Sequence, residues 1–337
     1  MTPVTATGSW YESPPDHGSP VPLRLLGRAR TLCGDCEWLE MCGGWSSSLC
    51  LDSIEGHGRC EDCPYCCAFW PDRFNAMINE VEGLHLDDVR AAPLTVPEIP
   101  SQVVKLRDGD LDRRWSDSFG QRIVATTLEA LIGRETAECS IRDQNHLDPS
   151  CMLLIDGCCK DVVLEANLWR RRWRPSLYGL FEMEAPCLLI APDMSLYSVG
   201  MPPCHKLYQI KRTFLMYQHY QDNGLAAIPF VSFDAEAHVT HIARWLKLNP
   251  CVTHIAASFQ TVHGSAYLWL RHFRLLEMLR DLVPRNLSWL LIGQSDNRQK
   301  SLEKRFGRIG SVVVGPKYGP MRKRDEAMQK LPLGCSA

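Results

Sequence analysis

The sequence predicts an α/β fold, a parallel (βα) TIM-barrel-like domain preceded by a small N-terminal Cys-rich module for a metal or a cluster. Two observations carry this prediction. Eight of the sixteen cysteines lie between Cys33 and Cys67. From about residue 102 onward, short apolar runs alternate with helical periodicity, which is the pattern of repeated βα units. The roughly 220 residues from 102 to 320 fit the lower end of the TIM-barrel size range, and a doubly wound open sheet is the competing fold.

The chain divides into five predicted segments. Residues 1–29 are rich in Pro, Ser, Gly and Thr and are expected to be disordered. Residues 30–75 form the Cys-rich module, and residues 76–101, which several prolines punctuate, are expected to be a linker. The barrel-like domain covers residues 102–320, and residues 321–337 form a basic tail.

Composition narrows the class of protein. The 337 residues are 45% hydrophobic and 23% charged with a net charge of −2, values typical of a globular protein. The chain shows no apolar run of the ~20 residues that a membrane helix needs, and no basic start followed by an apolar stretch. We therefore expect a cytoplasmic protein without a membrane partner. In that reducing compartment, dense cysteines indicate metal or cluster sites rather than disulfides.

The spacing of the cysteines indicates ligands. Two thiolates with two residues between them can reach one ion or one cluster, whereas the packing of a hydrophobic core requires no such interval. Three Cys-x2-Cys pairs occur within one short segment. The predicted metal ligands are Cys33, Cys36, Cys42, Cys50, Cys60, Cys63, Cys66 and Cys67.

Iron–sulfur chemistry is favoured over zinc for this module. Cys60-x2-Cys63-x2-Cys66 resembles the three-cysteine clasp of a four-iron cluster, which takes a remote fourth ligand. The segment that begins at Cys33 is similar to part of the auxiliary cluster domain of radical enzymes that mature peptides, but the C-x3-C-x2-C hallmark of radical enzymes is absent from the chain. We expect one or two 4Fe-4S clusters, with zinc as the alternative. The expected role is structural, because so short a segment cannot bury its own core.

Six apolar runs are expected to be strands buried on both faces, as in a parallel sheet. They cover residues 152–155, 187–191, 226–233, 254–259, 289–293 and 311–315. Helices are expected between them: residues 206–221 ahead of Asn223-Gly224, leucines at helical spacing ahead of Pro284, and a helix through Phe306 capped by Ser295.

Polar side chains follow these strands, and in a parallel barrel they would meet at one rim, where the chemistry of such folds takes place. The candidate catalytic residues are Asp193, Asp234, His263 and Lys317. The two carboxylates would act in acid–base chemistry or hold a metal, His263 would move a proton, and Lys317 would bind phosphate. The alternative is that Asp and Ser at these places are ordinary helix N-caps.

One segment near this rim resembles a known family. The residues are Ala191-Pro192-Asp193-Met194-Ser195-Leu196-Tyr197 with Met201-Pro202, preceded by Trp173, Pro175 and Tyr178 and followed by Gln209-Ile210, Arg212, Asn223-Gly224 and Ile228-Pro229. Their order resembles the PDFSLY…MP signature of the bacterial and phage domain-of-unknown-function family forty-four seventeen, over about residues 165–295. The resemblance implies a barrel-like α/β domain in a protein linked to phages or mobile elements. It implies no reaction, because the family has none assigned.

A basic stretch interleaves aromatic side chains with arginines, a mixture suited to pairing with phosphates and stacking on bases. The predicted nucleic-acid-binding residues are Trp169, Arg170, Arg171, Arg172, Trp173 and Arg174. A second basic region runs from Arg298 to Arg324. The alternative is that both are solvated helix faces and a basic tail.

Two functions from different classes follow. The first is a metal- or iron–sulfur-containing enzyme of a mobile element that acts on single-stranded nucleic acid or a nucleotide at the barrel rim. The second is a non-catalytic protein that binds nucleic acid or a protein partner and is scaffolded by a structural zinc or iron–sulfur module. Asp193 and Asp234 in one pocket would favour the enzyme, whereas separate capped helix starts would favour the binding protein.

Overall fold

The computed structural model describes ten segments of the chain: residues 38, 41, 71–105, 123–132, 140–145, 147–196, 201–262, 264–293, 296–307 and 309–314. The eight cysteines of the predicted module, together with His263 and Lys317, lie outside the described residues.

Eight parallel strands form one sheet in the order β5-β4-β3-β2-β1-β8-β7-β6. They are β1 (Gln102–Lys105), β2 (Ile123–Thr127), β3 (Met152–Asp156), β4 (Cys187–Ile190), β5 (Ala227–Ile228), β6 (His254–Ser258), β7 (Ser288–Ile292) and β8 (Ile309–Val314). The chain after β5 also bridges to β6: Val231 N–H donates to the Ala256 carbonyl (2.8 Å), and Ala256 N–H donates to the Pro229 carbonyl (2.9 Å). The α/β class with a parallel sheet is confirmed.

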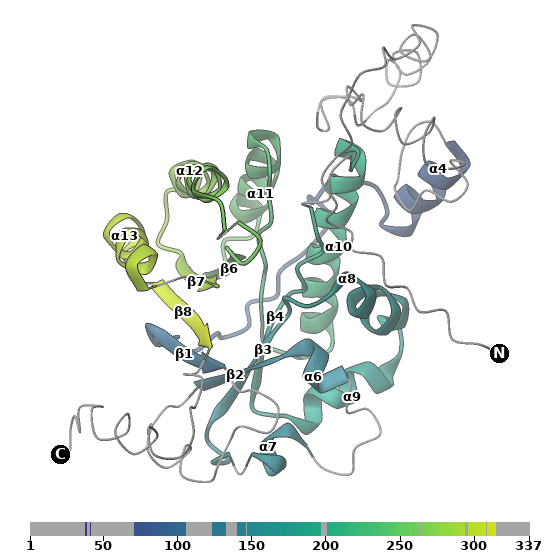
Figure 1. Cartoon of the computed structure of the whole chain (residues 1–337). Coiled ribbons are helices and arrows are strands. Elements are labelled where there is room, and N and C mark those ends of the chain that lie inside the picture. The colour runs from purple at the N-terminus through teal and green to yellow at the C-terminus, as the bar shows by residue number, and fades with distance from the viewer. Residues whose placement is uncertain are drawn as a thin grey trace, which may run out of the picture.

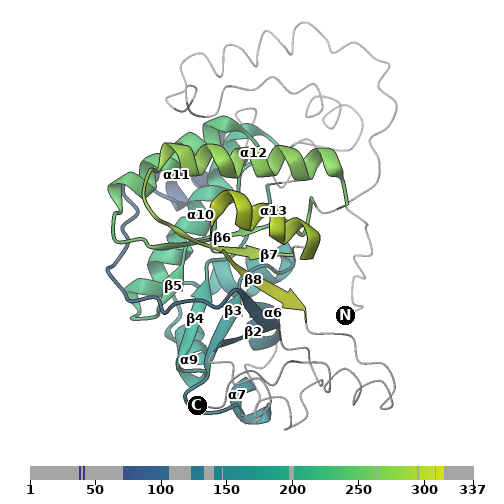
Figure 2. The ribbon, with the colours of Figure 1, turned by 90° about the vertical axis from the view of Figure 1, so that its left-hand side faces the viewer.

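Helices follow the strands along the chain and surround them in Figure 1, where α13, α12, α11, α10 and α8 succeed one another around the sheet. They are α4 (Pro71–Glu80), α6 (Leu128–Ile132), α7 (Ile141–Gln144), α8 (Asp161–Val163), η2 (Leu164–Leu168), η3 (Trp169–Arg171), α9 (Pro175–Met183), α10 (Pro203–Asp222), α11 (Glu236–Leu248), α12 (Ala266–Leu282) and α13 (Asp296–Phe306). Figure 2 shows α12 and α13 running across the outside of β6, β7 and β8. None of the helices that the structure describes is both long enough and apolar enough to cross a bilayer.

The predicted strands agree with the observed ones in place. Each of the six apolar runs contains a strand, because side chains buried on both faces must be apolar throughout. The run at 226–233 pairs as a strand only at Ala227–Ile228, since Pro229 has no N–H to donate to a ladder. Strands β1 and β2 were not predicted, because they are short and their polar ends break the apolar pattern.

The predicted linker is a packed strap, which we define as residues 81–92. Val81, Leu84, Leu86 and Val89 are fully buried. Side chains of α10 and α11 bind the strap backbone: Trp245 Nε1–H donates to the Val89 carbonyl at 2.9 Å, and Asn249, Gln218 and Gln221 accept from Ala91, Arg90 and Ala92 N–H. A linker with its backbone groups and apolar side chains satisfied in this way has a fixed position on the domain.

Trp38 joins the strap from a position between Cys36 and Cys42 in the sequence. It is 7% exposed, and its ring centroid lies 4.8 Å from that of His85. Gly83 has a φ of +94°, and a Cβ there would lie 3.0 Å from the Trp38 ring. A glycine therefore lets the indole approach the strap closely.

Buried ion pairs fix α10 to its neighbours. Arg212 is 2% exposed and forms a bidentate pair with Glu165, with N–O distances of 2.6 and 2.7 Å. Lys211 is fully buried, pairs with Asp88 and donates to the His85 carbonyl at 2.6 Å. A buried charge needs a partner of opposite sign, and Glu165 and Asp88 supply one to each cation. The two pairs tie α10 to the β3–β4 crossover and to the strap.

Candidate functional site

The carboxyl ends of four strands bring polar side chains to one edge of the sheet. Lys105 is the last residue of β1 and Asp156 the last residue of β3. Asp193 follows β4 by three residues, and Ser232 follows β5 by four. In parallel sheets all strands end at the same edge, so residues distant in sequence meet there.

Lys105 and Asp156 form an ion pair across β2. The Lys105 Nζ lies 2.6 Å from Asp156 Oδ2, the Asp156 side chain is fully buried, and that of Lys105 is 13% exposed. The second carboxylate oxygen, Oδ1, accepts from Cys158 N–H at 2.9 Å. Both oxygens of the buried carboxylate are thus satisfied, and the ion pair uses one of the three N–H donors of the ammonium.

Gly157 allows the ends of β3 and β4 to lie this close. A Cβ at this position would be 2.5 Å from the Ile190 carbonyl oxygen and 2.6 Å from that of Ala191. The Gly157 carbonyl in turn accepts from Asp193 N–H at 3.3 Å. Only a residue without a side chain fits, so this glycine sets the spacing of Asp156 and Asp193.

Asp193 is the most perturbed acid at this edge. Its residue is partly exposed, but its Oδ1 is buried without a hydrogen-bond partner. Burial, together with the nearby carboxyls of Asp161 and Asp156, raises the pKa of Asp193 to about 7, and a hydrogen bond from Ser232 opposes this increase. A carboxyl with this pKa exists in both protonation states at neutral pH, as proton transfer requires.

The loop that carries Asp193 is anchored at both ends. The Pro192 carbonyl accepts from Thr213 Oγ1–H of α10 at 3.0 Å, and Leu196 is fully buried. Residues 192–196 of the Pro-Asp-Met-Ser-Leu-Tyr segment therefore lie at the carboxyl edge of the sheet.

The two cysteines beside this carboxylate are not reactive. Burial raises the pKa of the Cys158 thiol well above its usual value, and the carboxyls of Asp156 and Asp193 add to the increase. Burial likewise raises the pKa of Cys159 to about 12. Thiolates, rather than thiols, are nucleophiles, so both side chains act as small packing groups at neutral pH.

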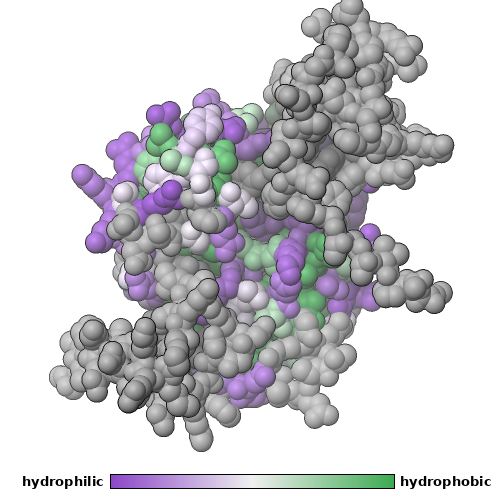
Figure 3. All heavy atoms as spheres, viewed as in Figure 1, coloured by the Kyte–Doolittle hydropathy of each residue, from purple (hydrophilic) through white to green (hydrophobic). Residues whose placement is uncertain are grey.

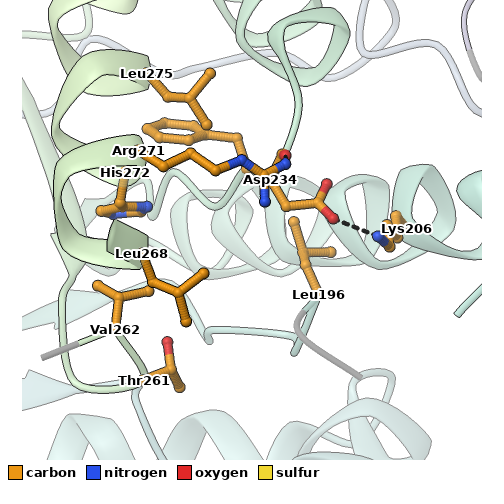
Figure 4. Close-up of a pocket in the computed structure, with 10 residues that line it drawn as sticks. Leu196, Lys206, Asp234, Thr261, Val262, Leu268, Arg271, His272 and Leu275 are labelled. Atoms are coloured by element: carbon orange, nitrogen blue, oxygen red, sulfur yellow. Dashed lines mark hydrogen bonds and ion pairs between the residues drawn. The ribbon is translucent and has the colours of Figure 1, made fainter. Parts of the chain in front are cut away.

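A pocket of about 390 Å³ adjoins this edge beyond β4, β5 and β6. Its lining residues come from the loops after these strands and from α10 and α12: Leu196, Lys206, Phe233, Asp234, Thr261, Val262, Leu268, Arg271, His272 and Leu275. Figure 4 shows Arg271 of α12 and Lys206 of α10 approaching Asp234 from opposite sides. The volume of the pocket falls within the range of small-molecule sites.

Asp234 links three basic groups. It forms an ion pair with Lys206, its Oδ1 lies 2.9 Å from His238 Nδ1, and its backbone carbonyl accepts from Arg271. Burial acts to raise the pKa of Asp234, but hydrogen bonds from His238 and Lys206 outweigh it and lower the pKa to about 2. Asp234 therefore stays ionised at neutral pH and holds Lys206 in place.

Neither predicted carboxylate caps a helix. The N-cap of α10 is Pro202 and that of α11 is Ala235, and neither forms a side-chain capping bond. Asp234 lines the pocket, whereas Asp193 contacts Ser232, two residues before Asp234. Residues two apart in extended chain are about 7 Å apart, so the two acids occupy adjoining parts of one edge.

The two histidines of α11 are buried rather than part of a polar helix face. His238 is 4% exposed and lies against Asp234. His241 is 8% exposed, its Nε2 is 3.2 Å from the Leu84 carbonyl, and burial lowers its pKa to about 4. The strap covers this face of α11, which the sequence pattern did not reveal.

The predicted nucleic-acid-binding stretch divides into buried and exposed residues. Trp169 and Arg172 are 3% and 8% exposed, and both bind the Glu80 carboxylate of α4, at 2.8 and 3.2 Å. Trp173 is 69% exposed and packs edge-on against His219 near the end of α10.

Arg170 and Arg174 are also exposed. Because α10 rises 1.5 Å per residue, the thirteen residues from Lys206 to His219 separate this stretch from the pocket by about 20 Å. The exposed basic stretch and the pocket are therefore distinct surfaces.

Three basic residues of the edge were missed by sequence reasoning, namely Lys105, Lys206 and Arg271. Lys206 and Arg271 lie within predicted helices, where a cation usually marks a solvated face. The sequence did contain a signal for Lys105. It directly follows the apolar pair Val103-Val104, just as Asp156 directly follows the apolar run 152–155.

The chain matches no known protein-family model and no curated protein sequence. Within the residues that the structure describes, no group of three or more His, Cys, Asp or Glu side chains is placed to hold a metal ion. The site is thus defined by its own geometry: a parallel α/β protein with a perturbed carboxyl, a buried Lys–Asp pair and a cation-lined pocket at the carboxyl edge of the sheet.

Proposed function

We propose that the sheet closes into an eight-stranded (βα) barrel and that the protein is an enzyme acting on a nucleotide or on nucleic acid at the rim of this barrel. The strand order from β1 to β8 and the bridge between the chain after β5 and β6 support closure. A closed parallel barrel gathers its chemistry at the carboxyl ends of the strands.

The observation that carries the enzymatic proposal is Asp193. Its pKa of about 7, its position after β4 and its buried, unpartnered Oδ1 are together typical of a catalytic acid or base rather than a structural carboxylate. Asp193 would transfer a proton to or from the substrate, and Lys105, positioned by Asp156, would stabilise negative charge that develops nearby. Asp234, as a permanent anion, would position Lys206.

His263 and Lys317 keep their proposed roles in proton transfer and phosphate binding. His263 follows Val262, a pocket residue, directly in the chain. A screen of 5′-nucleotides and single-stranded oligonucleotides as substrates, run in parallel on the native chain and on Asp193→Asn, tests the enzymatic proposal. Conversion by the native chain that is retained by the variant would remove Asp193 from the mechanism.

A second, non-catalytic function in nucleic-acid binding is supported by the exposed part of the basic stretch. Trp173 offers a ring to a base, and Arg170 and Arg174 flank it. The buried residues Trp169 and Arg172 would support the Trp173 ring. The Arg172 guanidinium lies 3.7 Å from the centroid of the Trp169 ring and 5.2 Å from that of Trp173. The stretch would bind single-stranded DNA or RNA through phosphates and one stacked base.

We expect Arg170→Ala with Arg174→Ala to weaken binding of a single-stranded oligonucleotide about tenfold at low salt, and to reduce the dependence of affinity on salt concentration. Each lost phosphate contact releases one counterion fewer. Fluorescence anisotropy across a salt titration measures both. Arg274→Ala with Lys247→Ala is the matched control, since the two residues are exposed on α12 and α11, lie outside both basic regions, and their loss removes the same charge. Equal effects of the two double variants would contradict a specific site.

The Cys-rich module would contain one or two 4Fe-4S clusters, or zinc in the alternative, in a structural role. The support remains the spacing of its cysteines. Trp38, the described residue between Cys36 and Cys42, packs on the strap, so the module would be attached to the domain at that point.

Protein prepared without oxygen is expected to be brown, with broad absorption near ~400 nm from charge transfer in the cluster. Cys63→Ala should lose metal and unfold the module, because ligation and folding are coupled in such segments. Metal analysis and limited proteolysis measure the two effects, with Cys251→Ala, a free cysteine outside the module, as control. Colourless protein with stoichiometric zinc would select the alternative metal, and full metal content in Cys63→Ala would contradict the ligand assignment.

A further inference from the structure

The pocket beyond β4, β5 and β6 has a marked excess of positive charge. Lys206 and Arg271 face one carboxylate, Asp234. Burial lowers the pKa of His272 to about 4, so that this ring is neutral at neutral pH. Two cations against one anion leave a net charge of about +1 in a concave site, which favours an anionic ligand.

Both cations retain donors for a ligand. Lys206 has three N–H groups and contacts Asp234, while Arg271 has five and contacts only the Asp234 carbonyl among the described residues. In Figure 4 the two side chains lie on either side of Asp234, and the open space of the pocket lies below them. An oxyanion placed there could receive hydrogen bonds from both.

Two helices begin at this pocket. Lys206 is in the first turn of α10, and Leu268 and Arg271 are in the first two turns of α12. The N-terminus of a helix carries partial positive charge. Ser265 caps α12 by accepting from Leu268 N–H, whereas the first turn of α10 has no side-chain cap. The start of α10 thus adds to the attraction that the two side chains exert on an anion.

Apart from Thr261, the rest of the lining is apolar. Leu196, Phe233, Val262 and Leu275 form a buried floor, and Leu268 lies at the rim with 40% of its surface exposed. Tyr267 and Leu270, on the same two turns of α12, are 74% and 43% exposed. Hydrophobic side chains are visible at the surface in Figure 3 in the region where α12 lies in Figure 1. A ligand that combines an anionic group with a largely apolar body would match this lining.

We propose that this pocket binds the phosphate monoester of a nucleotide, with the phosphate between Lys206 and Arg271 and the base against Leu268 and Leu196. The assignment rests on the proposed function and names its substrate class. A phosphate monoester supplies three acceptor oxygens and close to two negative charges at neutral pH. The same chemistry is offered by a free 5′-nucleotide and by the 5′-phosphorylated end of a single strand.

Calorimetric titration of the full-length protein with adenosine 5′-monophosphate tests the proposal, with adenosine and inorganic phosphate as partial ligands. The monophosphate is expected to bind more tightly than either partial ligand. Lys206→Gln and Arg271→Gln should each weaken it about tenfold or more, because each removes a charge-assisted hydrogen bond. Arg274→Gln is the matched control, since Arg274 is exposed one turn further along α12 and does not line the pocket. Its affinity should stay within about twofold of the native value.

A second titration compares a single strand carrying a 5′-phosphate with one carrying a 5′-hydroxyl. Tight, Arg271-dependent binding of the phosphorylated strand alone would identify a nucleic-acid end as the source of the phosphate. Equal binding of adenosine and its monophosphate, or equal affinities of Arg271→Gln and Arg274→Gln, would overturn the assignment, as would no binding of any phosphate ligand by the native chain. Asp193→Asn should bind like the native protein, so that failure of this pocket and failure of the acid–base proposal are observed separately.

Discussion

Asp193→Asn is expected to reduce turnover by about 10²–10⁴-fold, the range that a positioned acid or base contributes. An amide can neither donate nor accept the proton in question, although it fills the same space. With a substrate from the nucleotide screen, the native enzyme should show a limb in its pH–rate profile near pH 7, the pKa of Asp193. Asp193→Glu should recover part of the activity, which a purely structural role would not predict.

The same substitution should change how stability depends on pH. In the folded protein the pKa of Asp193 is about 7, against an ordinary value of 3.8. Between these values the unfolded chain releases a proton that the folded chain retains, so this group makes the folded state less stable as pH rises from about 4 to 7. The full difference corresponds to about 4 kcal/mol, and the partial exposure of the residue reduces our expectation to about 2 kcal/mol.

Urea unfolding of the native chain and of Asp193→Asn at pH 5 and pH 8 measures this effect. The native protein should lose about 1 kcal/mol more than the variant between the two pH values, because these cover only the upper part of the range from pH 4 to 7. Asp143→Asn provides the control, because Asp143 is an exposed aspartate on α7. If the native chain, Asp193→Asn and Asp143→Asn all respond alike to pH, the carboxyl of Asp193 is not perturbed and the central argument for an enzyme fails.

Gly157→Ala is expected to destabilise the protein by about 2–4 kcal/mol and to abolish activity. The added methyl group would lie 2.5 and 2.6 Å from two backbone carbonyl oxygens at the end of β4. Backbone atoms within a sheet cannot move away without a large cost in free energy. Relief of this contact must move β3 away from β4, and with it Asp156 and Asp193. Stability and site geometry should therefore fail together.

Gly179→Ala is the matched control for this prediction. A Cβ at Gly179, inside α9, would meet no atom within 4 Å. Alanine is also the better helix former, so the variant should be more stable by about 0.5–1 kcal/mol. Denaturant unfolding of both variants measures the difference. A Gly157→Ala protein as stable as Gly179→Ala would show that the ends of β3 and β4 can separate freely.

The order of strands and helices could be predicted because it depends on local pattern. Runs such as the one ending in Asp156 are apolar on both faces, and a strand between two parallel neighbours requires this. The helix that begins near Lys206 and the one that ends before Pro284 were equally visible, since helical spacing and chain breakers are local properties. The positions of Asp193 and Asp234 after strands followed directly.

The pairing of these residues with their partners could not be predicted in the same way. Lys206 meets Asp234 across 28 residues, Lys105 meets Asp156 across 51, and Arg172 meets Glu80 across 92. The periodicity of the sequence does not indicate which residues meet over such separations along the chain. The strap shows the same limit: the prolines between residues 93 and 100 indicated a linker for the stretch that includes it, but its packing depends on Trp245 and Asn249, more than 150 residues away.

The sequence by itself determined the α/β class, the place of six strands and three helices, and the two acids at the strand ends, because each depends on side chains close together in the chain. Tertiary structure alone decided their chemistry. Burial beside Asp161 and Asp156 brings the pKa of Asp193 to about 7, whereas Lys206 and His238 keep Asp234 ionised with a pKa of about 2. Two aspartates of the same intrinsic acidity thus differ because electrostatic energy depends on distance and solvent access, which only the folded chain fixes.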